Sequence, residues 1–217
     1  MTRIRQNSGS CPRNSCQISP IGAASARAGN VIGGGDWGAD RLVPDCIRAL
    51  SGHQPIGIRS PHAVRPWQHV LEPLGGYLLL GAALWQDPQK YSGAWNFGPD
   101  DGSHLTVAEM ADRLIQYWGD GSWNDSGTDF KSVPQGKALH EAKLLKLNCD
   151  KAHAGLNWHS VLTIDECLQM TAEWYKIFYA GSSNESTYKF CTQQIAEYVE
   201  SARKRNLNCA DKRATQP

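Results

Sequence analysis

The sequence lacks the composition of a nucleic-acid-binding or membrane protein. Its 22 Lys and Arg residues nearly balance its 21 Asp and Glu residues, and the formal net charge of +1 gives no bulk attraction to nucleic acid or to an anionic membrane. The longest apolar run, Tyr77–Trp85, is too short to span a bilayer and instead predicts a buried helix. We therefore expect no nucleic-acid partner and no membrane association.

The cysteine spacing of a structural zinc site is also absent. The 7 cysteines are scattered, no C-x-x-C occurs, and Cys11 and Cys16 have no accompanying histidines. Because structural zinc sites usually contain closely spaced ligand pairs, we expect no metal site. Dispersed cysteines in odd number predict a reduced, cytoplasmic protein.

Neither of the common glycine-rich phosphate loops is present. The stretch RAGNVIGGGDW (27–37) contains Gly29, Gly33, Gly34 and Gly35, which do not have the G-x-G-x-x-G spacing of a dinucleotide-binding turn. No Gly-Lys-Ser/Thr follows them, as a Walker loop would require. Two interpretations remain open: a tight turn that needs positive φ, or a loop whose backbone approaches a ligand closely.

The ends of the chain differ in composition from its middle. The first 20 residues include Arg3, Arg5 and Arg13 but no acidic residue, as in transit peptides, while Pro12 and Pro20 argue against an amphipathic helix. We interpret residues 1–21 as a disordered or unrelated leader and residues 206–217 as a flexible tail.

Between these ends the pattern predicts an α/β protein. Two T-x-x-E capping boxes, at 106–109 and 163–166, predict helices over Val107–Trp118 and Ile164–Tyr179. Apolar spacing, proline and glycine positions predict further helices at 41–50, 73–86, 150–154 and 192–205, strands at 23–28, 56–58, 94–98 and 144–147, and a loop at 119–137.

Four segments together resemble one family. They are RAGNVIGGGDW (27–37), DRLVPDCIRAL (40–50), RPWQHVLEPLGGYLLL (65–80) and GAWNFGPDD (93–101). These segments are similar to nucleotide-sugar enzymes of the extended short-chain dehydrogenase/reductase superfamily, and within it to the CDP-glucose 4,6-dehydratases. The triple glycine before Asp-Trp and the segment RPWQHVLEPL favour this family over dehydratases of dTDP- or GDP-sugars. The likeness covers about residues 22–198.

The resemblance implies a lyase that converts CDP-glucose to CDP-4-keto-6-deoxyglucose and water with a bound NAD. In this family NAD takes hydride from C4 of the glucose unit, water is lost across C5 and C6, and the hydride returns at C6. The cofactor supplies the redox chemistry and the protein supplies placement and proton transfer. The resemblance also implies that residues 22–205 form the edge of a Rossmann-type sheet with a smaller, helix-rich nucleotide-sugar-binding domain. It further implies that full-length members are homo-oligomers.

The family's cofactor and catalytic motifs have no counterpart here. Members contain a G-x-x-G-x-x-G dinucleotide loop and a Tyr-x-x-x-Lys pair, whereas no tyrosine of this chain has a lysine four residues later. We therefore assign no catalytic residue and leave the NAD-binding residues unknown. The chain is interpreted as the C-terminal part of such an enzyme, with the N-terminal cofactor half missing. Three possibilities stay open: turnover of CDP-glucose, binding of a nucleotide sugar without turnover, and action on another nucleotide sugar.

Substrate-binding residues can be inferred from the resemblance. Asn30 matches an asparagine that hydrogen-bonds the nucleotide sugar, and Arg41 matches a basic position near the diphosphate. Arg65 matches an arginine on the diphosphate, a role that suits its planar guanidinium. Asn96 is expected beside the nucleotide site. Weaker candidates for shaping the base pocket are Asp36, Trp37, Trp67 and His69.

Each candidate also has a structural interpretation. Asn30 could cap a turn, and Asn96 could satisfy buried backbone groups. Arg41 could be an exposed charge at a helix start. The tryptophans could belong to the core or to a pocket wall.

Overall fold

The computed structural model describes residues 21–100, 104–126 and 147–207. The strands are β1 (Ala24–Ala28), β2 (Asn30–Ile32), β3 (Ile56–Ile58), β4 (Val64–His69), β5 (Gly93–Phe97), β6 (His104–Thr106) and β7 (Trp123–Asp125). The helices are α1 (Leu42–Ser51), α2 (Leu71–Gln86), α3 (Pro88–Tyr91), α4 (Val107–Trp118), α5 (Asp150–Leu156), α6 (Ile164–Tyr179) and α7 (Asn184–Lys204). The α/β class predicted from the sequence is confirmed.

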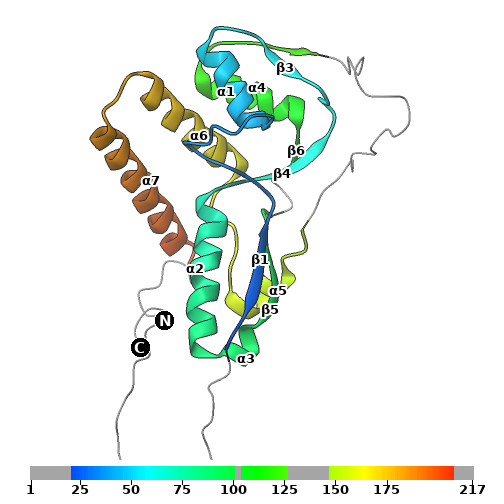
Figure 1. Ribbon diagram of the computed structural model, residues 1–217, viewed down its shortest axis with the longest axis vertical. Coiled ribbons are helices and arrows are strands. Elements are labelled where there is room, and N and C mark those ends of the chain that lie inside the picture. The colour runs from blue at the N-terminus through cyan, green and yellow to red at the C-terminus, as the bar shows by residue number, and fades with distance from the viewer. Residues whose placement is uncertain (1–20, 101–103, 127–146, 208–217) are drawn as a thin grey trace, which may run out of the picture.

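Short strands form three small sheets within the described residues (Figure 1). β1 pairs with β5 and β3 with β7, both in parallel, while β4 lies between parallel β2 and antiparallel β6. Only Gly29 separates β1 from β2. The chain therefore passes directly from the first sheet into the second at this residue.

The larger hydrophobic core lies where α1, α4 and α6 pack against β3 and β4. Ile47, Met110, Leu114, Leu168 and Tyr175 are fully buried there. Burial of each of these side chains contributes about 1.5–3 kcal/mol to stability. This core therefore stabilises the fold even though the strands that it covers are short.

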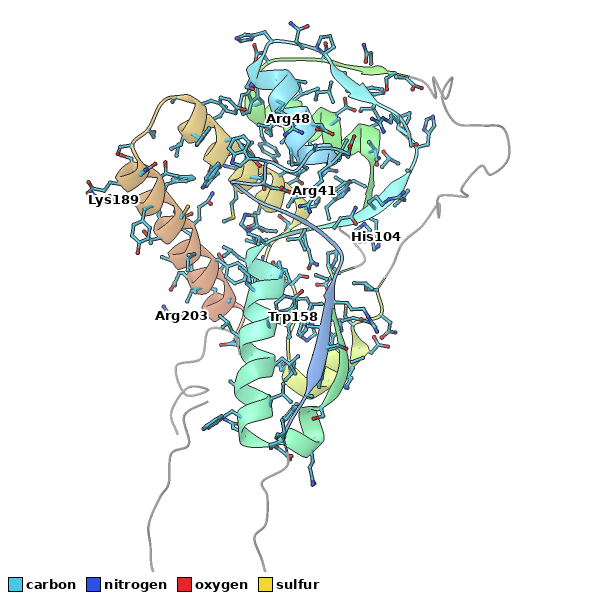
Figure 2. The ribbon with its side chains drawn as sticks, in the orientation of Figure 1. Arg41, Arg48, His104, Trp158, Lys189 and Arg203 are labelled. Atoms are coloured by element: carbon cyan, nitrogen blue, oxygen red, sulfur yellow. The ribbon has the colours of Figure 1, made fainter. Side chains whose placement is uncertain are left out.

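A second core joins α2 and α5 to β5. Phe97 and Trp158 pack edge to face with ring centroids 5.1 Å apart, and both are buried. Figure 2 labels Trp158 between these elements. A Cβ atom on Gly76 would overlap the Phe97 ring, so glycine is what allows α2 to approach β5.

The predicted capping boxes are confirmed. The Thr106 hydroxyl accepts a hydrogen bond from Glu109 N at 3.2 Å, and the Thr163 hydroxyl accepts one from Glu166 N at 3.3 Å. In return, each glutamate carboxylate accepts a hydrogen bond from the backbone N–H of its threonine, so α4 and α6 begin where the sequence predicts. The strand predicted at 56–58 and the helix predicted at 41–50 are also present, the latter as Leu42–Ser51.

The predicted start of the last helix was wrong. We expected it at Thr192, but α7 begins at Asn184, because Ser183 serves as its N-cap and its hydroxyl accepts from Ser186 N at 3.2 Å. Polar residues in the first turns hide this start from a search for apolar spacing. The helix predicted at 150–154 extends to Leu156.

The prediction that the run Tyr77–Trp85 is a buried helix was wrong about burial. The run forms most of α2, but Leu78 is 77% exposed and Trp85 is 88% exposed. The opposite face of α2, which includes Leu80, packs on the second core. None of the described helices combines the length and apolar character that a membrane span requires.

Some expectations concern residues outside the described ranges. The leader at 1–20, most of the strand at 144–147, most of the loop at 119–137 and most of the tail at 206–217 belong to this group. The described part of that loop contains β7. The division into leader, 22–205 and tail therefore stays a prediction.

Candidate functional site

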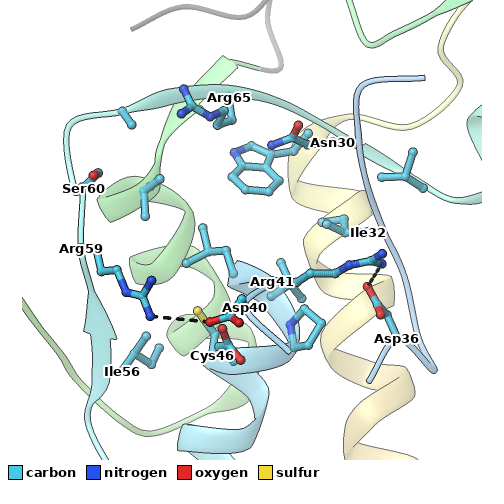
Figure 3. A pocket seen from close by; sticks show the side chains of 18 of the residues that line it. Asn30, Ile32, Asp36, Asp40, Arg41, Cys46, Ile56, Arg59, Ser60 and Arg65 are labelled. Carbon is cyan, nitrogen blue, oxygen red and sulfur yellow. Dashed lines mark hydrogen bonds and ion pairs between the residues drawn. The ribbon is translucent and has the colours of Figure 1, made fainter. Parts of the chain in front are cut away.

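A cavity of about 1200 Å³ opens beside β2 and β4 (Figure 3). Its walls come from the segment before α1, from the start of α1 and from the residues between β3 and β4. Five of the residues predicted to bind substrate line it: Asn30, Asp36, Arg41, Arg65 and Trp67.

Asn30 and Trp67 stand opposite each other on neighbouring strands. Their Cα atoms are register partners in the parallel β2–β4 ladder, and Trp67 is 5% exposed. Asn30 is the first residue of β2. The amide therefore sits at the start of a strand, beside an indole that serves both core and cavity wall.

Arg65 is a buried cation on β4. Its side chain is 8% exposed, and Nη1 donates to Val64 O at 3.0 Å. Figure 3 shows Arg65 at the edge of the cavity on the same side as Asn30. A guanidinium presents five N–H donors in a planar fork, a geometry that suits a bidentate contact with an anion.

Arg41 lies at the opposite side of the cavity as the N-cap residue of α1. Its Nη1 donates to Asp36 Oδ2 at 3.0 Å. The hydrogen bond from Gly38 N lowers the pKa of Asp36 below its ordinary value, and Arg41 lowers it further, while partial burial opposes both. Asp36 is therefore held as a carboxylate that orients Arg41.

A third arginine of the cavity was not predicted. Arg59, just after β3, places Nη2 3.6 Å from Asp40 Oδ1 (Figure 3). Nothing in the local pattern singles Arg59 out. It reaches the cavity because the residues after β3 fold back toward α1, a contact between segments distant in sequence.

Trp37, His69 and Asn96 do not line this cavity. Trp37 packs against aromatic rings of α6, with centroids 4.9 Å from Phe178 and 5.3 Å from Tyr175. Its place in an aromatic cluster corresponds to the structural alternative considered for the tryptophans.

His69 is buried at the end of β4, and burial lowers its pKa to about 4. Its Nδ1 accepts a hydrogen bond from Leu71 N, the first residue of α2, at 3.4 Å. Asn96 lies on β5, where its amide donates to Asn148 O at 3.0 Å. Both side chains serve neighbouring backbone, and a binding role for them stays a prediction.

The glycine-rich stretch serves the packing as well as the cavity. Gly33 lines the cavity, Gly34 lies directly under the Trp174 ring, and Gly35 has φ +80°. The two interpretations of this stretch therefore coexist: one glycine takes a left-handed conformation, one allows close packing, and one borders the cavity.

Taken together, the cavity offers three guanidinium groups, an amide and an indole face. Such a set can bind an anionic ligand and stack or contact a flat ring. The arginines are balanced by acidic neighbours, so an anionic ligand would compete with carboxylates for two of them.

Comparison with known proteins gives a consistent result. No protein-family model matches the chain. A CDP-glucose 4,6-dehydratase of Salmonella typhimurium is 41% identical over 180 residues, which are 82% of this chain and 47% of that protein. The resemblance expected from the sequence is confirmed.

Solved structures share the fold at low identity. A dTDP-glucose 4,6-dehydratase of Bacillus anthracis in complex with NAD is 18% identical, with a TM-score of 0.54 over 70% of this chain and 44% of that one. A UDP-glucuronic acid 4-epimerase of Bacillus cereus in complex with UDP-glucuronic acid and NAD is 18% identical, with a TM-score of 0.57 over 71% and 45%. The chain thus spans about half the length of a CDP-glucose 4,6-dehydratase to which it is similar in sequence, and it has the fold of part of the nucleotide-sugar dehydratases and epimerases.

Proposed function

We propose that the chain is the nucleotide-sugar-binding part of a CDP-glucose 4,6-dehydratase. The reaction would convert CDP-glucose to CDP-4-keto-6-deoxyglucose and water. The observation that supports this most strongly is the 41% identity over 82% of the chain. We also propose a cytoplasmic location, which the free thiols of Cys46, Cys149, Cys167 and Cys191 favour.

In this proposal the cavity binds the diphosphate and the base. Arg65 would donate to the diphosphate through its planar fork, and Arg41 and Arg59 would approach it from the other wall. Asn30 would hydrogen-bond the nucleotide sugar, and Trp67 would form the wall beside it. These residues bind and orient the substrate, and no proton-transfer role is assigned to them.

NAD would supply the hydride acceptor and donor of the dehydration. The described residues contain no tyrosine–lysine pair and no dinucleotide loop that could be assigned to it. No described residue is therefore assigned a contact with NAD. The second candidate function is binding of a nucleotide sugar without turnover. It is favoured because the described residues contain neither the tyrosine–lysine pair nor the dinucleotide loop.

Thermal unfolding of the full chain with CDP-glucose, UDP-glucose and dTDP-glucose tests the proposal. We expect a cooperative transition whose midpoint temperature rises most with CDP-glucose. At one hundred times Kd, this ligand should increase the free energy of unfolding by about 2.7 kcal/mol. A chain that unfolds cooperatively but responds to none of the three compounds would contradict the proposal.

Arg65 should contribute a large part of this affinity. Replacing it by alanine removes the charge-assisted fork, and we expect CDP-glucose to bind about 10- to 100-fold more weakly in calorimetry. Arg65→Lys keeps the charge but not the planar geometry, so it should restore only part of the affinity. Equal affinity of wild type and Arg65→Ala would refute the assignment.

Substitutions of Arg59 and of Asp40 should change the affinity for CDP-glucose in opposite directions. Arg59→Ala removes a cation from the cavity and should weaken binding, whereas Asp40→Asn frees Arg59 and removes a negative charge, and should strengthen it. Both changes should be about 2- to 5-fold, because the pair is exposed. Asn tolerates the positive φ of 59° at position 40, so the loop should keep its shape. A loss of affinity in both variants would indicate a structural role instead.

The exposed face of α2 supports the idea that more of the fold belongs beside it. Leu74, Leu78 and Trp85 are exposed on one side of this helix, and β1 pairs only with β5 among the described residues. We propose that the part of the dehydratase fold that this chain does not span covers this face and edge.

A further inference from the structure

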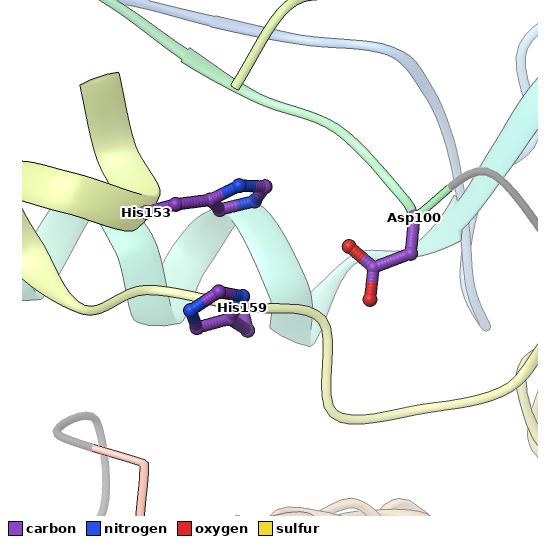
Figure 4. A group of neighbouring side chains, drawn as sticks. All are labelled: Asp100, His153 and His159. Carbon is purple, nitrogen blue, oxygen red and sulfur yellow. The ribbon is translucent and has the colours of Figure 1, made fainter. Parts of the chain in front are cut away.

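Two histidines and an aspartate converge at the end of β5, away from the cavity (Figure 4). Asp100 follows β5, His153 lies on α5, and His159 lies between α5 and α6. One ligand atom of each residue lies within 4.8 Å of those of the other two. In Figure 4 the Asp100 carboxylate points toward both imidazoles.

The ring of His153 has an unsatisfied polar atom at this place. Its Nε2 is buried and has no hydrogen-bond partner among the described residues. Leaving a buried polar atom unpaired costs about 1–3 kcal/mol, so the fold tolerates this cost at a point where an external partner could remove it. The two imidazoles stack with centroids 4.5 Å apart and planes 14° apart.

We propose that Asp100, His153 and His159 form a binding site for a divalent transition-metal ion, with Zn²⁺ as the best match. Two imidazole nitrogens and one carboxylate oxygen are a common zinc ligand set, with water as the fourth ligand. This differs from our expectation of no metal site, which rested on cysteine spacing and therefore could not detect a site made from three separate segments.

Binding requires a local rearrangement. Zinc ligands lie about 2.0–2.2 Å from the ion, so the three donor atoms must move closer together than they are here. The lone pairs of two nearly parallel rings do not converge, so one ring must also turn. His159 is the residue that turns, because it is half-buried in a connecting segment rather than fixed in a helix.

The site would fasten three segments of the lower part of the fold. It would join the end of β5 to α5 and to the segment that leads to α6. That segment contains the backbone N–H groups of Val161 and Leu162, which bind the buried carboxylate of Glu72. In this proposal the ion would stabilise this part of the fold, and its binding would not depend on substrate binding in the cavity.

Zinc titration of the metal-free full chain tests the site. We expect Zn²⁺ to raise the unfolding midpoint by about 5–10 °C at one hundred times Kd, and EDTA to reverse the rise. The rise should disappear in His159→Ala and in Asp100→Asn. Asp100 is exposed, so its variant should fold even if a histidine variant does not. His62→Ala, which removes an exposed histidine outside the cluster, is the matched control and should keep the full rise.

Cobalt absorption separates this site from binding by cysteine. Co²⁺ bound here should give visible d–d bands without sulfur-to-cobalt charge transfer, because the ligands are nitrogen and oxygen. Sulfur charge transfer, no thermal response to Zn²⁺, or a rise retained in both Asp100→Asn and His159→Ala would each overturn the proposal.

Discussion

Replacing Gly34 by alanine is expected to destabilise the protein by about 3 kcal/mol, which denaturant unfolding can measure. A Cβ atom at this position would overlap the ring of Trp174 on α6. Gly34 does not have positive φ, so the cost comes from steric overlap and not from backbone conformation. Trp174 stacks on Phe178 with centroids 5.7 Å apart, and a displaced ring would lose this contact as well. Tryptophan fluorescence of the native state should change accordingly.

Gly81 is the matched control for this substitution. It lies on α2, and a Cβ atom there would contact nothing within 4 Å. Gly81→Ala should therefore stabilise the protein by up to about 1 kcal/mol, because alanine favours the helix. If Gly34→Ala changed the stability no more than Gly81→Ala does, the close packing between the glycine turn and α6 would not exist in solution. Gly34→Ala should also weaken ligand binding, since neighbouring Gly33 borders the cavity.

The elements with local signals could be predicted from the sequence. Both capping boxes fixed the first residues of α4 and α6, since each involves atoms only three residues apart. β2 was missed because it has three residues and exists only through pairing with β4, a contact between distant segments. The exposed side of α2 was missed for a related reason: an apolar run indicates a helix, but not which of its faces has a partner.

The same distinction between local sequence signals and contacts among distant segments applies to the candidate site. Asn30, Arg41 and Arg65 were inferred from a family resemblance and line one cavity. Arg59 was not inferred, because its place depends on how the segment after β3 packs beside α1. Asn96 lies outside the cavity, on β5, which pairs with β1 in a different sheet from β2 and β4. Residue type and order along the chain therefore identified candidates, while tertiary packing decided which of them share one cavity.

Glu72 is a buried carboxylate that joins three parts of the fold. It is 2% exposed on α2 and accepts hydrogen bonds from Leu162 N at 2.7 Å, Val161 N at 2.9 Å and the Tyr198 hydroxyl at 3.0 Å. These donors hold the segment before α6 and the helix α7 against α2. Removing the acceptor would break all three of these hydrogen bonds.

The stability of the protein should fall between pH 4.5 and pH 7 because of this residue. Burial raises the pKa of Glu72 to about 7 from an ordinary value of 4.5, although its hydrogen bonds act in the opposite direction. Below pH 4.5 the group is protonated in both folded and unfolded chains. As the pH rises, the unfolded chain releases this proton first, which lowers the free energy of the unfolded state. The free energy of unfolding therefore falls by about 3 kcal/mol by pH 7 because of this group.

Two variants of Glu72 separate its charge from its hydrogen bonds. Glu72→Gln keeps an acceptor but cannot ionise, so its free energy of unfolding should change less than that of wild type between pH 4.5 and pH 7. Glu72→Ala loses the acceptor and should be less stable by about 3–5 kcal/mol at every pH, because it leaves buried donors unpaired. Glu197→Gln, on the exposed side of α7, should retain the wild-type pH profile. Denaturant unfolding across this pH range distinguishes them. A pH profile of Glu72→Gln that matches wild type would mean that another group causes the decline, because only ionisation at position 72 links this three-way contact to pH.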